Sequence, residues 1–206
     1  MNENFWELLM KLEQLLIPYC RILNILQTDK ARLYEVLHGF AYLYQFWKKY
    51  EDNNMANRIL ARLQQRWKLW EQPLLILSWL LHPSYKTNYF TSPIISQISY
   101  LHMGKWLVYY YKAWTGSDPQ TILAEFDEFS QGKKYPFDSA TVSQFDNNIH
   151  KYWCWIQEAY PEIGTVAARI FGICVNAASV ERLWSSMGFY HTKNRNRLKV
   201  NNLIDF

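Results

Sequence analysis

The sequence has few of the residues that tight turns and covalent cross-links require. It holds seven glycines and seven prolines in 206 residues, which is low for an all-β protein with many turns. Its three cysteines, Cys20, Cys154 and Cys174, are widely spaced and form no Cys-x-x-Cys pair. This spacing excludes a disulfide framework and a zinc knuckle, so we expect reduced thiols inside a cell.

Long hydrophobic runs and targeting signals are also lacking. The densest apolar run, PLLILSWLL at 73–81, is about half as long as a bilayer-spanning helix needs to be. The first residues include acids and a tryptophan and no basic stretch, unlike a signal peptide. We therefore expect a soluble intracellular protein that has no membrane as its partner.

What the sequence does contain favours a packed core. Half of its residues are hydrophobic and only 19% are charged, a balance that argues against a disordered chain. The net charge of +4 is compatible with nucleic acid binding but too small to identify it.

Apolar residues recur at the three- and four-residue steps of a helix. In segment 5–26 Pro18 predicts a break or kink, and Asp118 is expected to cap a helix that begins at Pro119. No segment alternates as a half-buried strand would, so the expected fold class is all-α, or nearly so. The segments expected to be helical are 5–26, 29–50, 55–71, 73–81, 94–114, 118–130, 140–160, 162–175 and 179–188.

The segment 131–138 is the best candidate for a domain boundary. It places a glycine, a proline and two lysines between helical patterns, a composition typical of a connection. We therefore expect one unit over residues 1–132 and a second over residues 140–206.

Specific motifs lie in segment 160–206. In chain order they are Tyr160-Pro161, Ala167-Ala168, Ile170, Ser179, Glu181-Arg182, Trp184-Ser185, Gly188 and Arg195-Asn196-Arg197-Leu198. Their order and spacing resemble the C-terminal dimerisation region of the hAT family of DNA transposases, with Trp184 where the family more often has Phe. A second stretch, 73–86, is similar to a segment in the middle of hAT proteins.

The resemblance implies a split RNase H-like core that a large helical insertion domain interrupts. Residues 1–132 would then be the remainder of the insertion domain, and residues 140–206 the closing helices of the core together with the dimerisation surface. A homodimer or higher oligomer, DNA binding and a nuclear location are implied as well. The residues expected to form the dimerisation surface are Val166, Ile170, Ile173, Leu183, Trp184, Leu198 and Leu203.

Glu181 matches the last carboxylate of the family's Asp-Asp-Glu set, which holds two divalent metal ions for strand cleavage and transfer. One carboxylate cannot hold two hard cations, and the family places the two Asp residues upstream of the insertion domain. We therefore interpret Glu181 as vestigial or incomplete and expect no cofactor for this chain, with Mg²⁺ or Mn²⁺ only in a complete core. Alternatively, Glu181 is an ordinary acid in the first turn of a helix capped by Ser179.

Two groups of basic residues are candidates for DNA contacts. Residues of the first group recur every four positions and would form one stripe on a helix, suited to tracking phosphates. The alternative is an ordinary solvated face opposite Ile59, Leu63 and Trp70. This first group is Arg58, Arg62 and Arg66.

The second basic group lies near the end of the sequence and matches an Arg-Arg-Leu element of the family. It would contact DNA, or it would pair with acids such as Glu181. This group is Lys193, Arg195, Arg197 and Lys199.

Together these features predict a dimerisation module that can bind DNA and is catalytically incomplete alone. Two alternatives stay open. One is a metal-dependent DNA transposase whose missing Asp residues come from upstream sequence or from another chain. The other is a domesticated regulator that keeps only the protein–protein surface.

Overall fold

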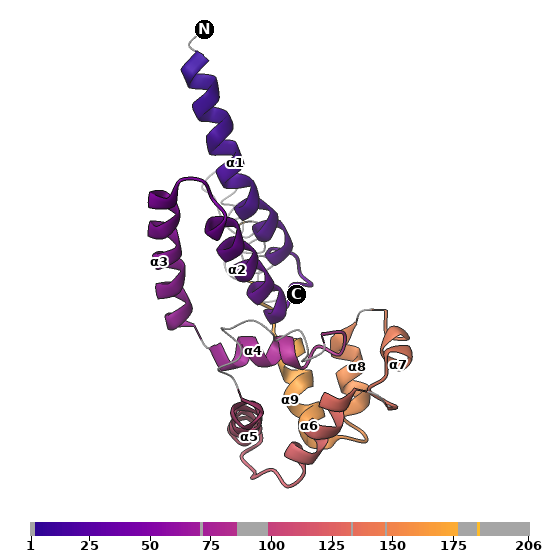
Figure 1. Cartoon of the computed structure of the whole chain (residues 1–206). Coiled ribbons are helices and arrows are strands. Elements are labelled where there is room, and N and C mark those ends of the chain that lie inside the picture. Colours follow the sequence, from indigo (N-terminus) through magenta and orange to yellow (C-terminus); the bar gives the residue numbers. More distant parts are fainter. Residues whose placement is uncertain are drawn as a thin grey trace, which may run out of the picture.

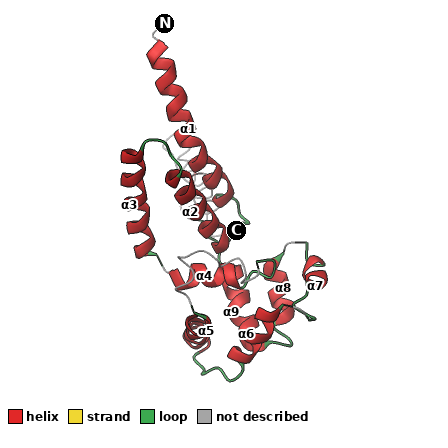
Figure 2. Cartoon of the chain, in the orientation of Figure 1, coloured by secondary structure: helices red, strands yellow, loops and turns green. Residues whose placement is uncertain are grey.

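The computed structural model describes residues 3–70, 72–85, 99–132, 134–146, 148–176 and 185. Within these ranges every regular element is a helix, and none is a strand (Figure 2). The all-α class expected from the sequence is confirmed.

Two groups of helices can be followed in Figure 1. The first three helices form an arm in the upper part of the view, and the remaining helices form a body below it. The helices are α1 (Glu3–Leu26), α2 (Leu33–Lys48), α3 (Asn53–Leu69), α4 (Gln72–Leu80), α5 (Tyr100–Thr115), α6 (Ile122–Gln131), α7 (Ser139–Ser143), α8 (Ile149–Ile156) and α9 (Pro161–Gly172).

Helices α1 and α2 form an antiparallel hairpin. Gly39 of α2 lies so close to α1 that a Cβ there would come within 2.7 Å of the Ile22 side chain. Further along, the Trp47 indole N–H donates to the Tyr19 hydroxyl at 2.6 Å. Of the break or kink predicted at Pro18, the break is wrong, because α1 continues through this buried residue. The packing of Tyr19 and Ile22 on α2 outweighs the one backbone hydrogen bond that a proline removes.

The body is built around α9, which packs against α4, α5, α6 and α8. Trp153 of α8 is fully buried, and its indole N–H donates to the carbonyl of Leu81 at 3.0 Å. Residues from both sides of segment 131–138 share this hydrophobic core. The boundary predicted there is therefore a connection within one core, because Phe129 before the segment contacts the ring of Trp153 after it, and Phe137 inside the segment contacts both rings.

Two buried glutamates join the first turns of α6 and α9. The Glu162 carboxylate accepts hydrogen bonds from the backbone N–H groups of residues 120–122, at 2.6 to 2.7 Å. In return, the Glu125 carboxylate accepts from the backbone N–H groups of Glu162 and Ile163, at 3.1 and 2.8 Å. Each carboxylate thus provides acceptors for the N–H groups that the first turn of the other helix leaves unpaired.

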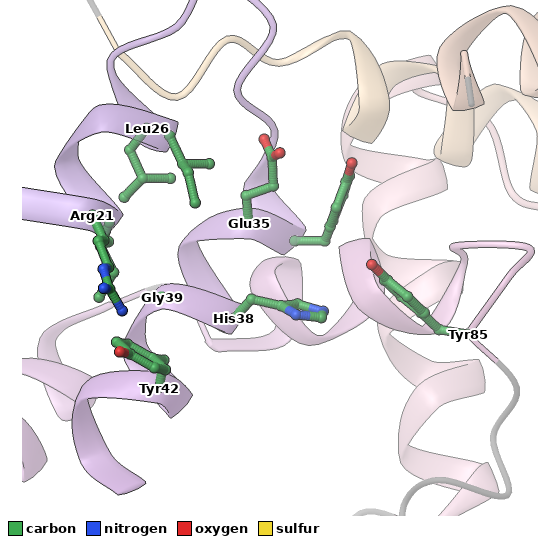
Figure 3. A pocket seen from close by; sticks show the side chains of 10 residues that line it. Arg21, Leu26, Glu35, His38, Gly39, Tyr42 and Tyr85 are labelled. Carbon is green, nitrogen blue, oxygen red and sulfur yellow. The ribbon is translucent and has the colours of Figure 1, made fainter. Parts of the chain in front are cut away.

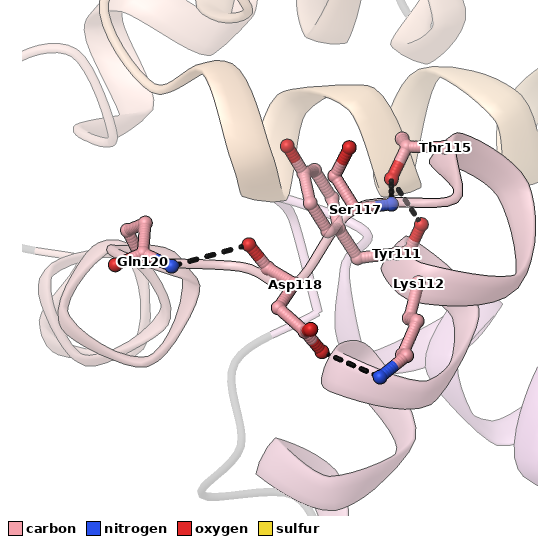
Figure 4. Close-up of polar contacts among 6 residues, drawn as sticks. All are labelled: Tyr111, Lys112, Thr115, Ser117, Asp118 and Gln120. Carbon is pink, nitrogen blue, oxygen red and sulfur yellow. Dashed lines mark hydrogen bonds and ion pairs between the residues drawn. The ribbon is translucent and has the colours of Figure 1, made fainter.

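This pairing explains why Asp118 does not cap α6. The helix begins at Ile122, three residues later than the predicted start at Pro119, because Glu162 accepts its first N–H groups. The Asp118 carboxylate instead pairs with Lys112 of α5 at 2.7 Å (Figure 4). Since both side chains are exposed, this ion pair contributes little to stability.

Candidate functional site

The N-terminal half of α1 stands clear of the other described helices (Figure 1). Every residue from 4 to 14 is exposed. Soluble monomers rarely expose an apolar patch this large, and such patches usually mark binding surfaces. Ten large apolar side chains of α1 are 37–60% exposed: Phe5, Trp6, Leu8, Leu9, Met10, Leu12, Leu16, Ile17, Leu23 and Ile25.

Apolar residues of α1 follow two adjacent stripes. The first stripe is partly buried and faces α2; it consists of Leu15, Tyr19, Ile22 and Leu26. The second stripe lies about 100° further around the helix. We call it the outer seam; it consists of Phe5, Leu9, Leu12, Leu16 and Leu23, which are 44–57% exposed.

The outer seam has the spacing of a helix–helix contact. Its members follow one another at steps of four and three, with Tyr19 filling the longer gap before Leu23. Steps of this kind keep one line of side chains facing a neighbouring helix. Within the described residues α2 covers the first stripe and no element covers the outer seam.

Helix α3 has a different character, because its sequence contains three arginines and a lysine and no acid. Arg58, Arg62 and Arg66 are all exposed, and their four-residue spacing places them on one face. Ile59 and Leu63 are partly buried on the other side. Among the described residues none of these arginines forms an ion pair, so the stripe predicted from the sequence is an uncompensated positive face.

A cavity of about 560 Å³ lies between α1, α2 and Tyr85 (Figure 3). Its charged lining residues are Arg21 of α1 and Glu35 of α2. One Glu35 oxygen already accepts from the backbone N–H of Arg32 at 2.7 Å, at the start of α2. The remaining lining residues are Ile22, Ile25, Leu26, Tyr34, His38, Gly39 and Tyr42.

The rings beside this cavity are neutral near pH 7. Burial, and secondly the charge of Glu35, raise the pKa of Tyr34 to about 12. Burial lowers the pKa of His82 to about 4 and also lowers the pKa of His38, whose Nε2 accepts from the Trp79 indole at 2.8 Å. At pH 7 the Tyr34 hydroxyl therefore keeps its proton and the His82 ring carries no charge.

Most of the site residues expected from the sequence lie outside the described residues. Val166 and Ile170 are described and are completely buried in the core of the body. Their side chains therefore stabilise the chain's own fold and offer no surface, while Ile173 just beyond α9 is partly buried. Those outside the described residues are Glu181, Leu183, Trp184, Lys193, Arg195, Arg197, Leu198, Lys199 and Leu203.

Across the described ranges no three His, Cys, Asp or Glu side chains gather as a metal site would require. None of the helices there has the length and apolar character to cross a bilayer.

No family model, curated protein or solved structure matches this chain. The exposed surfaces of α1 and α3 are the features of the described residues that bear on function.

Proposed function

We propose that this chain is a protein-assembly module that self-associates, related to the C-terminal part of hAT transposases and without a complete catalytic centre of its own. The observation that carries the proposal is the uncovered outer seam of α1. The motifs of segment 160–206 support the relationship to transposases, in which this part of the chain serves dimerisation.

The size of the outer seam suggests a modest affinity. Completing the burial of a half-exposed Leu or Phe is worth about 1 kcal/mol. Five such side chains on each of two copies give roughly 10 kcal/mol, against an association cost of about 4–15 kcal/mol. At the low end of that cost the surplus is about 6 kcal/mol, a Kd of tens of micromolar, so the association is weak and sensitive to single changes in the seam.

We expect the double variant Leu9→Glu with Leu16→Glu to be monomeric where the unaltered protein is a dimer. Two carboxylates on the seam would have to lose water at the interface, which is strongly unfavourable. Because both positions are exposed in the single chain, the helix content should not change. Sedimentation velocity at about 50 µM, where mass action favours assembly, measures the difference.

The matched control is Gln14→Glu, which adds a charge to the exposed side of α1 opposite the seam. This variant should remain a dimer. A monomeric unaltered protein at that concentration, or an equal loss of dimer in the control, would contradict the proposal.

A second candidate function, contact with the phosphates of a nucleic acid, is favoured by the acid-free helix α3. The helix is about 25 Å long, and its three exposed arginines share one face. Cations on such a face displace counterions from the phosphate backbone, which makes binding strong at low salt and weak at high salt.

We expect replacement of Arg58, Arg62 and Arg66 by alanine to weaken binding to a short duplex DNA at least tenfold at low salt. The slope of log K against log salt should flatten by up to about 2.7, at 0.9 for each lost phosphate contact. Fluorescence anisotropy over a salt series measures both quantities.

The control removes the same charge elsewhere, by alanine at the exposed residues Lys105, Lys134 and Lys151. If this control weakens binding as much as the α3 variant, net charge and not the α3 face is responsible. Unchanged binding in the α3 variant would exclude the face altogether.

A further inference from the structure

The structure points to an antiparallel pairing of α1 with the α1 helix of a second copy of this chain. We infer that the free N-terminal half of each α1 lies along the C-terminal half of the other. This inference rests on the proposed self-association and adds the partner element, its direction and its register.

The register follows from the symmetry of the outer seam. Its positions, with Tyr19 included, are 5, 9, 12, 16, 19 and 23, and they are symmetric about residue 14. Helix α1 spans Glu3–Leu26, so residue 14 is also at the middle of the helix. A twofold axis there would bring the two helices into full overlap. It would also place Phe5 opposite Leu23, Leu12 opposite Leu16, and Leu9 opposite Tyr19, a residue of the first stripe that already packs partly on α2. Each pair occurs twice, as an isologous contact requires.

This register gives three kinds of residue pair between the two helices. Phe5 faces Leu23 of the second copy, Leu9 faces Tyr19, and Leu12 faces Leu16. All of these side chains are apolar or aromatic, and the five members of the outer seam are each about half exposed in the single chain. The pairing therefore leaves no charged residue within the seam.

The antiparallel direction follows from where α2 ends. The partly buried side chains of α1 that face α2 begin only at Leu15, whereas residues 4–14 are exposed. An antiparallel partner places each exposed half beside the other copy's α1–α2 hairpin. The four helices α2, α1 and their two counterparts then form a continuous layer of bundle-like packing. A parallel partner would instead place the two exposed halves against each other. The helices α4 to α9 of both copies would then lie at the same end of the pair.

The available area fits a weak, specific dimer. A stripe along half of a cylinder about 36 Å long and 10 Å wide gives on the order of 500 Å² for each copy. Two copies would bury about 1,000 Å², the lower limit of specific interfaces.

The charge of α1 favours a protein partner over a lipid surface. The helix carries three acids and two bases, whereas helices that lie on membranes usually have a polar face rich in Lys and Arg. An acidic helix gains nothing from anionic lipid headgroups.

Cysteine cross-linking tests direction and register together. In a background in which the exposed Cys20, Cys154 and Cys174 are replaced by serine, we would add Phe5→Cys and Leu23→Cys and oxidise with diamide. Within one helix these positions are about 27 Å apart, far beyond the reach of a disulfide. The double variant should therefore run as a covalent dimer on a non-reducing gel, and each single variant should remain uncross-linked.

The outcomes separate this inference from the proposed function. Cross-linking of Phe5→Cys alone would show a parallel pair and overturn the inference. A double variant that sediments as a dimer without cross-linking would overturn the register while leaving self-association intact. A protein that is monomeric and binds anionic vesicles instead would overturn both.

Discussion

We expect Glu162→Gln to lower the free energy of unfolding at pH 7 by about 3 kcal/mol. In the unaltered protein the backbone N–H groups donate to the Glu162 carboxylate at 2.6 to 2.7 Å. Glutamine would keep one acceptor oxygen, but its NH₂ group would face some of these N–H groups. A buried donor left without an acceptor costs about 1–3 kcal/mol, and the favourable charge at the start of α6 is lost as well. The shift of the urea midpoint measures the change.

The effect of Glu162→Gln should depend on pH in a defined direction. Burial raises the pKa of the Glu162 carboxyl, but hydrogen bonds from the three backbone N–H groups lower it by more, so its pKa lies below the ordinary 4.5. A carboxyl whose pKa falls on folding stabilises the protein above its unfolded pKa, and this stabilisation is lost as pH drops through the folded pKa. The unfolding midpoints of the two proteins should therefore differ fully at pH values above the ordinary carboxyl pKa of 4.5 and converge as the pH falls through the lower pKa of the folded state.

Two further variants show whether the glutamates act as a pair. Glu158→Gln removes the same charge at an exposed position close by and should change the midpoint by less than about 0.5 kcal/mol. Glu125→Gln should be destabilising, and the double variant with Glu162→Gln should cost less than the sum, because both carboxylates hold the same two helix ends. Strict additivity, or no pH dependence in the difference, would contradict the reciprocal arrangement.

The same pair marks the limit of what local sequence patterns predict. Helical spacing alone predicted most helices to within a few residues, because that spacing reflects which side of each helix is buried. The start of α6 was missed because the acceptor for its N–H groups, Glu162, lies 40 residues away from Ile122. A capping rule examines neighbours in the sequence, and there the Asp118-Pro119 pair predicts an earlier start.

Long-range packing also explains the domain boundary. Segment 131–138 has the composition of a linker, yet Phe129 before it contacts Trp153 after it, and its own Phe137 packs against both rings. The composition of a segment indicates its local conformational freedom. It does not show which hydrophobic core the neighbouring residues pack into.

The outer seam of α1 could have been found from the sequence. Segment 5–26 has more apolar residues than one buried face of a helix requires, and the excess falls at steps of three and four. What sequence alone could not decide is which of the two stripes α2 covers. Gly39 decides it, because its missing side chain lets Ile22 of the first stripe come close.

We expect Gly164→Ala to destabilise the body by about 2–3 kcal/mol. A Cβ at this position of α9 would lie 2.6 Å from the Cα and 3.0 Å from the backbone nitrogen of Gln157, at the end of α8. Because these are backbone atoms, no change of rotamer relieves the contact, and the two helices must move apart. Overpacking of this kind typically costs 1–3 kcal/mol, and here it would disturb the core around Trp153.

Gly172→Ala, in the same helix, should have the opposite sign. Its Cβ would meet only the His150 ring, at 3.4 Å, an ordinary contact. Alanine restricts the unfolded chain more than glycine does, so a gain of up to about 1 kcal/mol is expected. Urea midpoints of both variants test the packing of α8 on α9 with one chemical change. A neutral Gly164→Ala variant would contradict the close packing of the first turn of α9 on Gln157. It would then also contradict the position from which Glu162, two residues earlier, contacts α6.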